Sequence, residues 1–284
     1  MIREVTSTNV DAARAFLERH TETALYLLSN LAAHGPRMGE ALSSGDFRLI
    51  EEDGAIAAVF CLTLRGNLLA ETGGRADLAA AIFESCANVP IRIVGVVGEW
   101  RCAEALWKLL AAKPGFTATR ATKENLFGLE LKDAPPPPAD GQDIRTLARD
   151  DFEIWRRVNA AFMLESNLPV QGTLEQQKAQ YEAQADPGHW WGLFENGKLA
   201  TTVALNAVYG PLGQVGGVYT PPEWRRKGLA RAAMRALIAD SAGRLGLKRL
   251  ILFTGEENLA AQSLYESLGF RVIGHIGLFF GTWS

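Results

Sequence analysis

Cysteine and histidine are scarce in this chain of 284 residues, which contains three cysteines and four histidines. Cys61, Cys86 and Cys102 stand singly in apolar stretches, without a CxxC motif or a His/Cys spacing that would hold zinc. We therefore expect no metal site. The thiols are typical of small buried hydrophobic residues in a protein from a reducing compartment.

Neither half of the chain carries a strong excess of one charge. Residues 1–141 contain 14 Lys and Arg against 18 Asp and Glu, and the remainder contains 15 against 14. General nucleic-acid binding therefore has little support. No run of 18 apolar residues occurs, and Met1-Ile2-Arg3-Glu4 lacks the apolar stretch of a signal peptide. These absences predict a cytoplasmic protein that does not enter a membrane.

The length and composition indicate two domains. A chain of this length, with 48% hydrophobic and 21% charged residues, can form two cores of ordinary globular composition. Residues 134–141 include four consecutive prolines, which favour an extended connector over helix or sheet. We expect domains at residues 1–133 and 142–284, joined by this linker.

Strand and helix patterns alternate in both halves. In the second half we expect strands at 143–146, 189–195, 198–207, 215–219, 249–253 and in a closing hairpin at 270–273 and 276–280, with helices at 150–163, 173–184, 228–245 and 259–268. The first half gives a shorter version, with strands at 47–51, 55–64, 68–71 and 91–97 and helices at 10–19, 76–86 and 102–112. Residues 91–116 align with 249–270, which indicates a tandem duplication of mixed α/β (α+β) domains.

A basic loop lies between an expected strand and an expected helix, in residues 218–230. The strand stops at Pro221-Pro222 and the helix begins near Gly228, so unpaired backbone N–H groups meet at the positive end of a helix dipole. Gly228 and Ala230 leave room for an anion to approach the backbone, and the basic run 225–227 adds positive charge. The loop therefore predicts a phosphate site; the alternative is a helix start with a solvated basic face.

Two motifs connect this loop to a known family. Arg225-x-x-Gly228-x-Ala230 resembles the Q/R-x-x-G-x-G/A pyrophosphate loop of the GNAT superfamily of N-acetyltransferases. Asn258-x-x-Ala261-x-x-x-Tyr265-x-x-x-Gly269-Phe270 is similar to that family's second coenzyme A motif. The resemblance covers residues 142–284 clearly and the first half in outline. It implies two GNAT-like domains, each with a mixed, mostly antiparallel central sheet flanked by helices.

The resemblance also implies that acetyl-CoA binds the second half as a co-substrate. Its pantetheine arm would lie along the strand at Val218, splayed from the strand at 249–253, with the pyrophosphate on the loop. Asn258 would reach the arm, although it can equally serve as the N-cap of the following helix. The expected cofactor-binding residues are Val218, Tyr219, Arg225, Arg226, Lys227, Gly228, Leu229, Ala230 and Asn258.

Tyr265 is the candidate catalytic acid. It lies two helical turns after Asn258, so both side chains can face one groove. When an acetyl group passes directly from a thioester to an amine, a phenol of pKa about 10 can protonate the departing thiolate, whose conjugate acid has a pKa of about 8.5. The alternative for Tyr265 is an aromatic ring that packs on Phe270.

The sequence assigns no general base. Glu165, Glu256 and Glu257 are candidates, and each is more typical of a solvated surface carboxylate. No histidine stands near a Ser or Cys nucleophile motif, so direct transfer without an acyl-enzyme is the simpler mechanism. Trp190 and Trp191 could line an acceptor pocket with His189, although neighbouring strand residues point to opposite faces and at least one tryptophan is expected in the core.

The sequence thus predicts an N-acetyltransferase acting on a small-molecule or peptide amine, and it is compatible with a homodimer. The alternative is a catalytically silent acyl-CoA-binding or sensor protein. A nucleotide-binding protein is disfavoured because neither G-x-x-x-x-G-K-S/T nor G-x-G-x-x-G occurs. The first half is expected not to bind coenzyme A. Only Thr72-Gly73-Gly74-Arg75 separates its strand from its helix, and Trp107, a poor acid, aligns with Tyr265.

Overall fold

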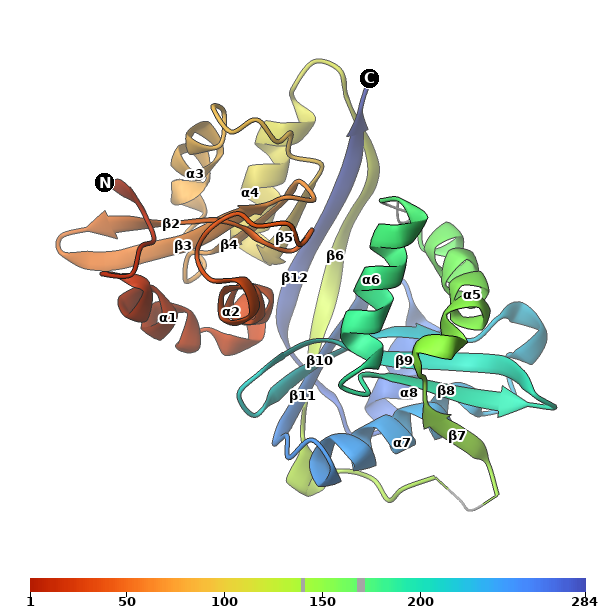
Figure 1. Ribbon diagram of the computed structural model, residues 1–284. Helices are drawn as coiled ribbons and strands as arrows, with labels where there is room; N and C mark the ends of the chain where they lie inside the picture. Colours follow the sequence, from red (N-terminus) through yellow and green to blue (C-terminus); the bar gives the residue numbers. More distant parts are fainter. Residues whose placement is uncertain (139–140, 168–171) are drawn as a thin grey trace. The chain divides into compact units, whose positions relative to one another are not determined.

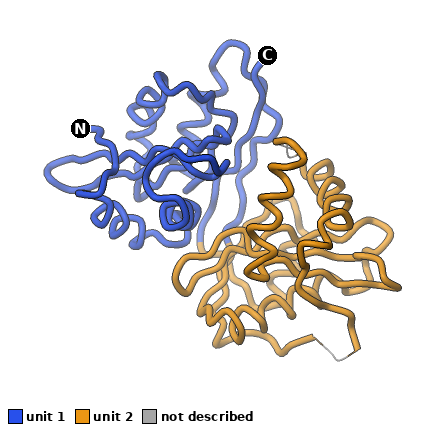
Figure 2. The backbone as a smooth tube through the Cα atoms, in the orientation of Figure 1, with its two compact units in different colours: residues 1–126, 274–284 blue, residues 127–273 orange. Residues whose placement is uncertain are grey.

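The computed structural model describes residues 1–138, 141–167 and 172–284. Figure 2 distinguishes two compact units: unit 1 comprises residues 1–126 and 274–284, and unit 2 comprises residues 127–273. The chain passes twice through the same order of elements, namely a strand, two α-helices, three strands, a helix, a strand, a helix and a final strand. This repetition is the predicted tandem duplication of a mixed α/β fold.

Unit 1 holds the first passage through these elements. They are β1 (Ile2–Glu4), α1 (Val10–Glu18), α2 (Thr21–His34), β2 (Gly45–Glu52), β3 (Ala55–Thr63), β4 (Asn67–Glu71), α3 (Ala79–Ser85), β5 (Gly95–Glu99), α4 (Trp100–Ala111) and most of β6 (Phe116–Glu130). Strands β1 to β5 lie in chain order, antiparallel except for the parallel pair β4–β5. Helices α1 and α2 cover one face of the sheet, and α3 and α4 cover the other (Figure 1).

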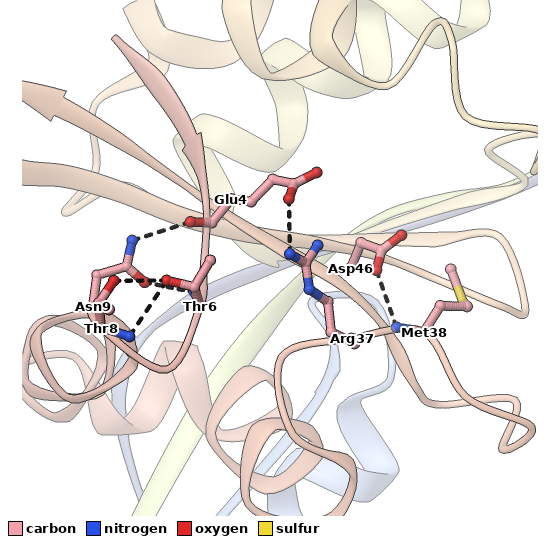
Figure 3. A network of polar contacts seen from close by, with 7 residues as sticks. All are labelled: Glu4, Thr6, Thr8, Asn9, Arg37, Met38 and Asp46. Carbon is pink, nitrogen blue, oxygen red and sulfur yellow. Dashed lines mark hydrogen bonds and ion pairs between the residues drawn. The ribbon is translucent and has the colours of Figure 1, made fainter.

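A polar network ties β1 to the segment between α2 and β2 (Figure 3). Glu4 accepts a hydrogen bond from the Arg37 guanidinium at 2.8 Å, and Asp46 accepts one from the backbone N–H of Met38 at 3.0 Å. The Asn9 side chain donates to the carbonyl of Glu4 at 3.0 Å. The hydrogen bond from Arg37 lowers the pKa of Glu4. The three exposed residues of β1 are held at the edge of the sheet by their antiparallel pairing with β2, and the network adds side-chain contacts to it.

Unit 2 holds the second passage. Its elements are β7 (Asp143–Thr146), α5 (Phe152–Glu165), α6 (Leu174–Ala185), β8 (Trp190–Glu195), β9 (Lys198–Tyr209), β10 (Leu212–Tyr219), α7 (Leu229–Gly243), β11 (Arg249–Gly255), α8 (Leu259–Ser267) and the start of β12 (Arg271–Trp283). Strands β7 to β11 again lie in chain order, and β10–β11 is again the parallel pair. Helices α5 and α6 cover one face, and α7 and α8 cover the other (Figure 1).

The two faces of the unit 2 sheet have separate apolar cores. One packs the alanine-rich helix α7 and α8 against the sheet through residues such as Leu237, Leu250 and Phe270. The other packs α5 and α6 through aromatic residues such as Trp155 and Tyr181. The three cysteines are free and buried in unit 1. Within the described part of the chain, every helix is too short or too polar to span a bilayer.

The structure corrects the expected closing strands and the start of β5, and it adds two elements that were not predicted. Residues 271–283 form one strand, so the predicted closing hairpin at 270–273 and 276–280 is wrong, as is the placement of His275 in it. The strand stays extended because residues 276–280 pair with β5 in an antiparallel register. Helix α2 and the long strand β6 were not predicted, and β5 begins at Gly95 instead of residue 91.

The compact units differ at their edges from the domains expected at 1–133 and 142–284. Residues 127–130 of β6 belong to unit 2, where the N–H of Leu131 donates to the carbonyl of Lys248 at 2.9 Å. Residues 274–284 belong to unit 1, where β12 pairs with β5. The last strand of each repeat therefore contributes to the unit built by the other. Ala139 and Asp140 of the expected linker lie outside the described residues.

Candidate functional site

Strands β10 and β11 separate after a short parallel pairing. Their registered pairs run from Leu212↔Arg249 to Gln214↔Ile251, and β10 continues for five more residues to Tyr219. Over this stretch β10 stays paired with β9, with register shifts after Gln214 and after Gly216. The pairing of the two strands thus leaves a gap beside residues 215–219, the place where the family resemblance expects a pantetheine arm.

A bulge at Gly216-Gly217 shapes this gap. Gly217 has a φ of 57°, and a Cβ atom there would lie 2.7 Å from the indole ring of Trp190. The hydroxyl of Thr202 donates to the carbonyl of Gly217 at 3.0 Å, which fixes the bulge against β9. This bulge was not predicted, although two consecutive glycines inside a strand pattern indicate one.

The expected phosphate loop leads from the end of β10 into α7. Arg226 and Gly228 adopt positive φ angles of 61° and 76°, and the other residues of the loop do not. The first hydrogen bond of α7 runs from the N–H of Ala232 to the carbonyl of Gly228 at 3.1 Å. The amides of Leu229 and Ala230 consequently have no carbonyl of their own helix to bond. Alternating φ signs before a free helix N-terminus form a concavity suited to an anion.

Arg225 faces a carboxylate instead of the open side of this loop. Its Nη2 donates to both oxygens of Glu165, at 2.7 and 2.6 Å, and its Nε donates to the carbonyl of Thr220 at 2.9 Å. Its backbone N–H donates to the carbonyl of Pro222 at 3.3 Å. Of the three basic residues expected to attract phosphate, Arg225 is therefore already paired, which leaves Arg226 and Lys227. The Lys227 ammonium lies 4.6 Å from the Trp224 ring centroid.

The carboxylate of Glu165 is held in its charged form. The hydrogen bond from Arg225, supported by one from the Tyr219 hydroxyl at 3.0 Å, lowers the pKa of Glu165. Burial and this carboxylate raise the pKa of Tyr219. A carboxylate with a lowered pKa is a weaker proton acceptor, so Glu165 is poorly suited to be the general base. The side chain of Glu257, another candidate, folds back over Gly255.

Asn258 and Tyr265 lie at the two ends of α8. The Asn258 Oδ1 accepts the N–H of Ala261 at 3.2 Å, so its predicted alternative as an N-cap is confirmed. The amide nitrogen of Asn258 is not used by that cap. Tyr265 is buried, and its ring centroid lies 6.0 Å from Phe127 and 6.2 Å from Phe270. The ring packs against Phe270, as the alternative for Tyr265 predicted. Packing involves the ring, whereas proton transfer would involve the hydroxyl, so the catalytic role of Tyr265 stays a prediction.

The two tryptophans expected near an acceptor pocket both belong to cores. Trp190 packs against Trp155 on the α5 face, with ring centroids 5.2 Å apart. Trp191 belongs to the core on the α7 face, and its Nε1 donates to Asp240 at 3.1 Å. The side chains of Trp190 and Trp191 point to opposite faces of the sheet because they are neighbours in one strand, as predicted. Burial lowers the pKa of His189, which favours a neutral ring.

The corresponding region of unit 1 is closed. Pairs between β4 and β5 run to Ala70↔Gly98, one residue before the end of β4, so these strands do not separate as β10 and β11 do. The buried carboxylate of Glu71 accepts hydrogen bonds from the Thr23 hydroxyl and from the N–H of Gly73. The ring of Trp107, at the position aligned with Tyr265, stacks on Phe279.

Comparison with known proteins agrees with this geometry. Residues 144–270 match the acetyltransferase (GNAT) family. A mycothiol acetyltransferase of Thermobispora bispora is 35% identical over 175 residues, which cover 57% of this chain and 57% of that protein. The chain thus matches little more than half the length of this curated relative.

Solved structures extend the similarity of the fold to the whole chain. An acetyltransferase of the GNAT family from Colwellia psychrerythraea has a TM-score of 0.56 at 15% identity and covers 100% of both chains. A tandem GNAT protein from the clavulanic acid biosynthesis pathway has a TM-score of 0.55 at 14% identity and covers 100% of this chain and 98% of that one. Residues 144–270 thus match the GNAT acetyltransferase family, and the whole chain shares the fold of solved GNAT proteins, one of which is described as a tandem GNAT protein.

Proposed function

We propose that unit 2 is an N-acetyltransferase that moves an acetyl group from acetyl-CoA directly to an amine. The observation that carries this proposal is that the pairing of β10 with β11 ends at Gln214, while β10 runs on to Tyr219 and the loop that leads into the N-terminus of α7. A thioester cofactor with an extended arm and a pyrophosphate suits these two features together. The family of residues 144–270 and the names of the curated relatives support the same activity.

In this proposal acetyl-CoA is held mainly by backbone groups. The pantetheine arm would pair with the exposed edge of β10 near Val218, and the pyrophosphate would accept hydrogen bonds from the amides of residues 226–230. Backbone donors at a helix N-terminus bind phosphate without desolvating a side-chain cation. Arg226 and Lys227 add positive charge at the rim, and the amide nitrogen of Asn258 is available to the arm.

The chemical step transfers the acetyl group without a covalent enzyme intermediate. The neutral amine forms a bond to the thioester carbonyl carbon, the carbon–sulfur bond breaks, and Tyr265 gives its proton to the leaving thiolate. Before it attacks, the acceptor ammonium gives its first proton to a base that we leave unassigned, because Glu165 is occupied by Arg225. The nitrogen loses a second proton as the amide forms, and this proton passes directly or through solvent to the tyrosinate, which restores Tyr265 for the next turnover.

The relatives suggest which acceptor to test first. They are named mycothiol acetyltransferases, so an amine related to mycothiol is the first candidate, followed by other small-molecule or peptide amines. The cytoplasm remains the predicted location.

An assay of free thiol release tests the proposal. The protein is incubated with acetyl-CoA and a panel of amines that includes mycothiol-related compounds, and thiol release is compared with a reaction lacking amine. Amine-dependent release with acetylation of the nitrogen, found by mass spectrometry, is the expected result. Tight binding of acetyl-CoA with no release across the panel would favour the silent sensor protein, and the absence of acetyl-CoA binding would refute both functions.

A further inference from the structure

We propose that Glu165 and Arg225 form a positioning pair that holds the phosphate loop in its binding conformation, and that Arg225 is not itself a phosphate ligand. The proposal rests on the proposed function for its binding test and on the loop alone for its second test. It changes the role that the family resemblance gives to Arg225.

The pair joins three segments of unit 2. Glu165 is the last residue of α5, Tyr219 is the last residue of β10, and Arg225 lies in the loop before α7. One carboxylate accepts hydrogen bonds from both the Tyr219 hydroxyl and the Arg225 guanidinium. The guanidinium also lies 5.8 Å from the Tyr219 ring centroid. The end of the strand, the loop and the helix are thus held at one point.

The same guanidinium fixes the loop internally. Its Nε donates to the carbonyl of Thr220, five residues back, so the loop is closed across its base. The next residue, Arg226, must adopt a φ of 61°, an unfavourable angle for a side chain of this type. A closed base therefore helps to hold Arg226 in the conformation that turns the following amides toward one side. A lysine lacks the planar fork needed to bond a carbonyl and a carboxylate at once.

The charge of Arg225 is poorly placed to bind phosphate. Its carboxylate partner neutralises it, and phosphate binding would require the contact of Nη2 with both carboxylate oxygens to break. Its backbone N–H is also occupied, by the carbonyl of Pro222. The two side chains are 41% and 49% exposed, so the pair contributes modestly, and we expect effects of about 3- to 10-fold on affinity.

Calorimetry with acetyl-CoA separates a positioning role of Arg225 from a role as phosphate ligand, because E165Q changes the affinity in opposite directions in the two cases. If Arg225 were a ligand, E165Q would release it and tighten binding; as a positioning pair, E165Q weakens binding by about 3- to 10-fold. If Arg225 were a phosphate ligand, R225K would keep most of the affinity for acetyl-CoA. If Arg225 acts through its planar fork, R225K weakens the binding of acetyl-CoA. Tighter binding in E165Q, or unchanged affinity in R225K, would overturn the proposal.

Hydrogen exchange without acetyl-CoA supplies the second test. The amides of Trp224, Arg225 and Ala232 are hydrogen-bonded within or beside the loop, and their exchange should accelerate in E165Q. The control is E153Q, which breaks the exposed pair Glu153–Arg156 on the same helix and should leave these amides unchanged. Equal exchange in E165Q and the parent protein would refute the pair. If the parent protein fails to bind acetyl-CoA, the proposed function falls while this measurement still decides the pair.

Discussion

The carboxylate of Glu71 accepts the backbone N–H of Gly73 at 2.7 Å, two residues away across the turn that follows β4. Gly73 and Gly74 both have positive φ angles and would otherwise form a small anion-binding turn. In unit 1 a side chain of the protein itself occupies the place where unit 2 presents free amides. An external phosphate would have to displace a buried carboxylate that is also bonded by Thr23.

We therefore predict one acetyl-CoA site per chain. The closed pairing of β4 with β5 and the carboxylate of Glu71 leave unit 1 without a groove for the arm or a cradle for the phosphate. Calorimetry on the intact protein should give a stoichiometry of one. Two sites, or a single site that survives damage to the loop before α7, would contradict this division between the units.

Gly228→Val should greatly weaken acetyl-CoA binding, and more than Arg226→Ala. Gly228 has a φ of 76°, and no atom lies within 4 Å of the place a Cβ would take, so valine fits sterically but is strained and covers the backbone approach. Gly246→Val is the control, because it introduces the same backbone strain of about 1–2 kcal/mol away from the loop. Gly246 lies beyond the end of α7, and it has a similar φ angle and equally open surroundings. Calorimetry should show weakened binding in the first variant alone; equal affinity of Gly228→Val and the parent would remove the loop from the site.

Tyr265→Phe should fold and bind acetyl-CoA but turn over about 10²-fold more slowly, because it loses only the proton donor. The ring contacts with Phe127 and Phe270 are kept. Tyr181→Phe is the control, since the Tyr181 hydroxyl donates to the carbonyl of Ala148 in a core and should affect stability only. The measurement is kcat over a range of pH. An unchanged rate, with chemistry shown to be limiting, would exclude Tyr265 as the acid.

The stability of the protein should fall in acid partly through Asp151. Its carboxylate accepts two hydrogen bonds from Arg145, at 2.7 Å each, and one from the N–H of Ala148. The hydrogen bond from Arg145 lowers the pKa of Asp151. This stabilisation is complete above the unfolded pKa of about 3.9 and is lost as the pH falls through the lower folded pKa.

Asp151→Asn should accordingly reduce the free energy of unfolding by about 1 kcal/mol at neutral pH, and this difference from the parent should shrink below about pH 4. Asp150→Asn changes the neighbouring exposed carboxylate and serves as the control. The free energies come from urea unfolding at a series of pH values. A difference that stays constant down to about pH 2 would show that Asp151 does not act through its charge.

Local signals in the sequence identified most of unit 2 because they act over short distances. The break between the expected strands at 189–195 and 198–207 falls on Asn196-Gly197, and both residues have the positive φ angles of a tight turn in the structure. The loop before α7 was located from its prolines and glycine. The continuous strand β12 was not predicted, because its pairing with β5 joins residues far apart in the chain. The ion pair of Arg225 was also missed, since only the folded chain brings Glu165 to it.

The exchange of final strands has a consequence for the evolution of the chain. Residues 274–284 are encoded after unit 2 yet complete the sheet of unit 1, and residues 127–130 are encoded with the first repeat yet belong to unit 2. A deletion of either repeat would therefore remove a strand from the survivor. A first repeat whose groove has closed cannot be discarded as a separate module, and its sequence is free to drift only where it does not weaken the strands that the two repeats share.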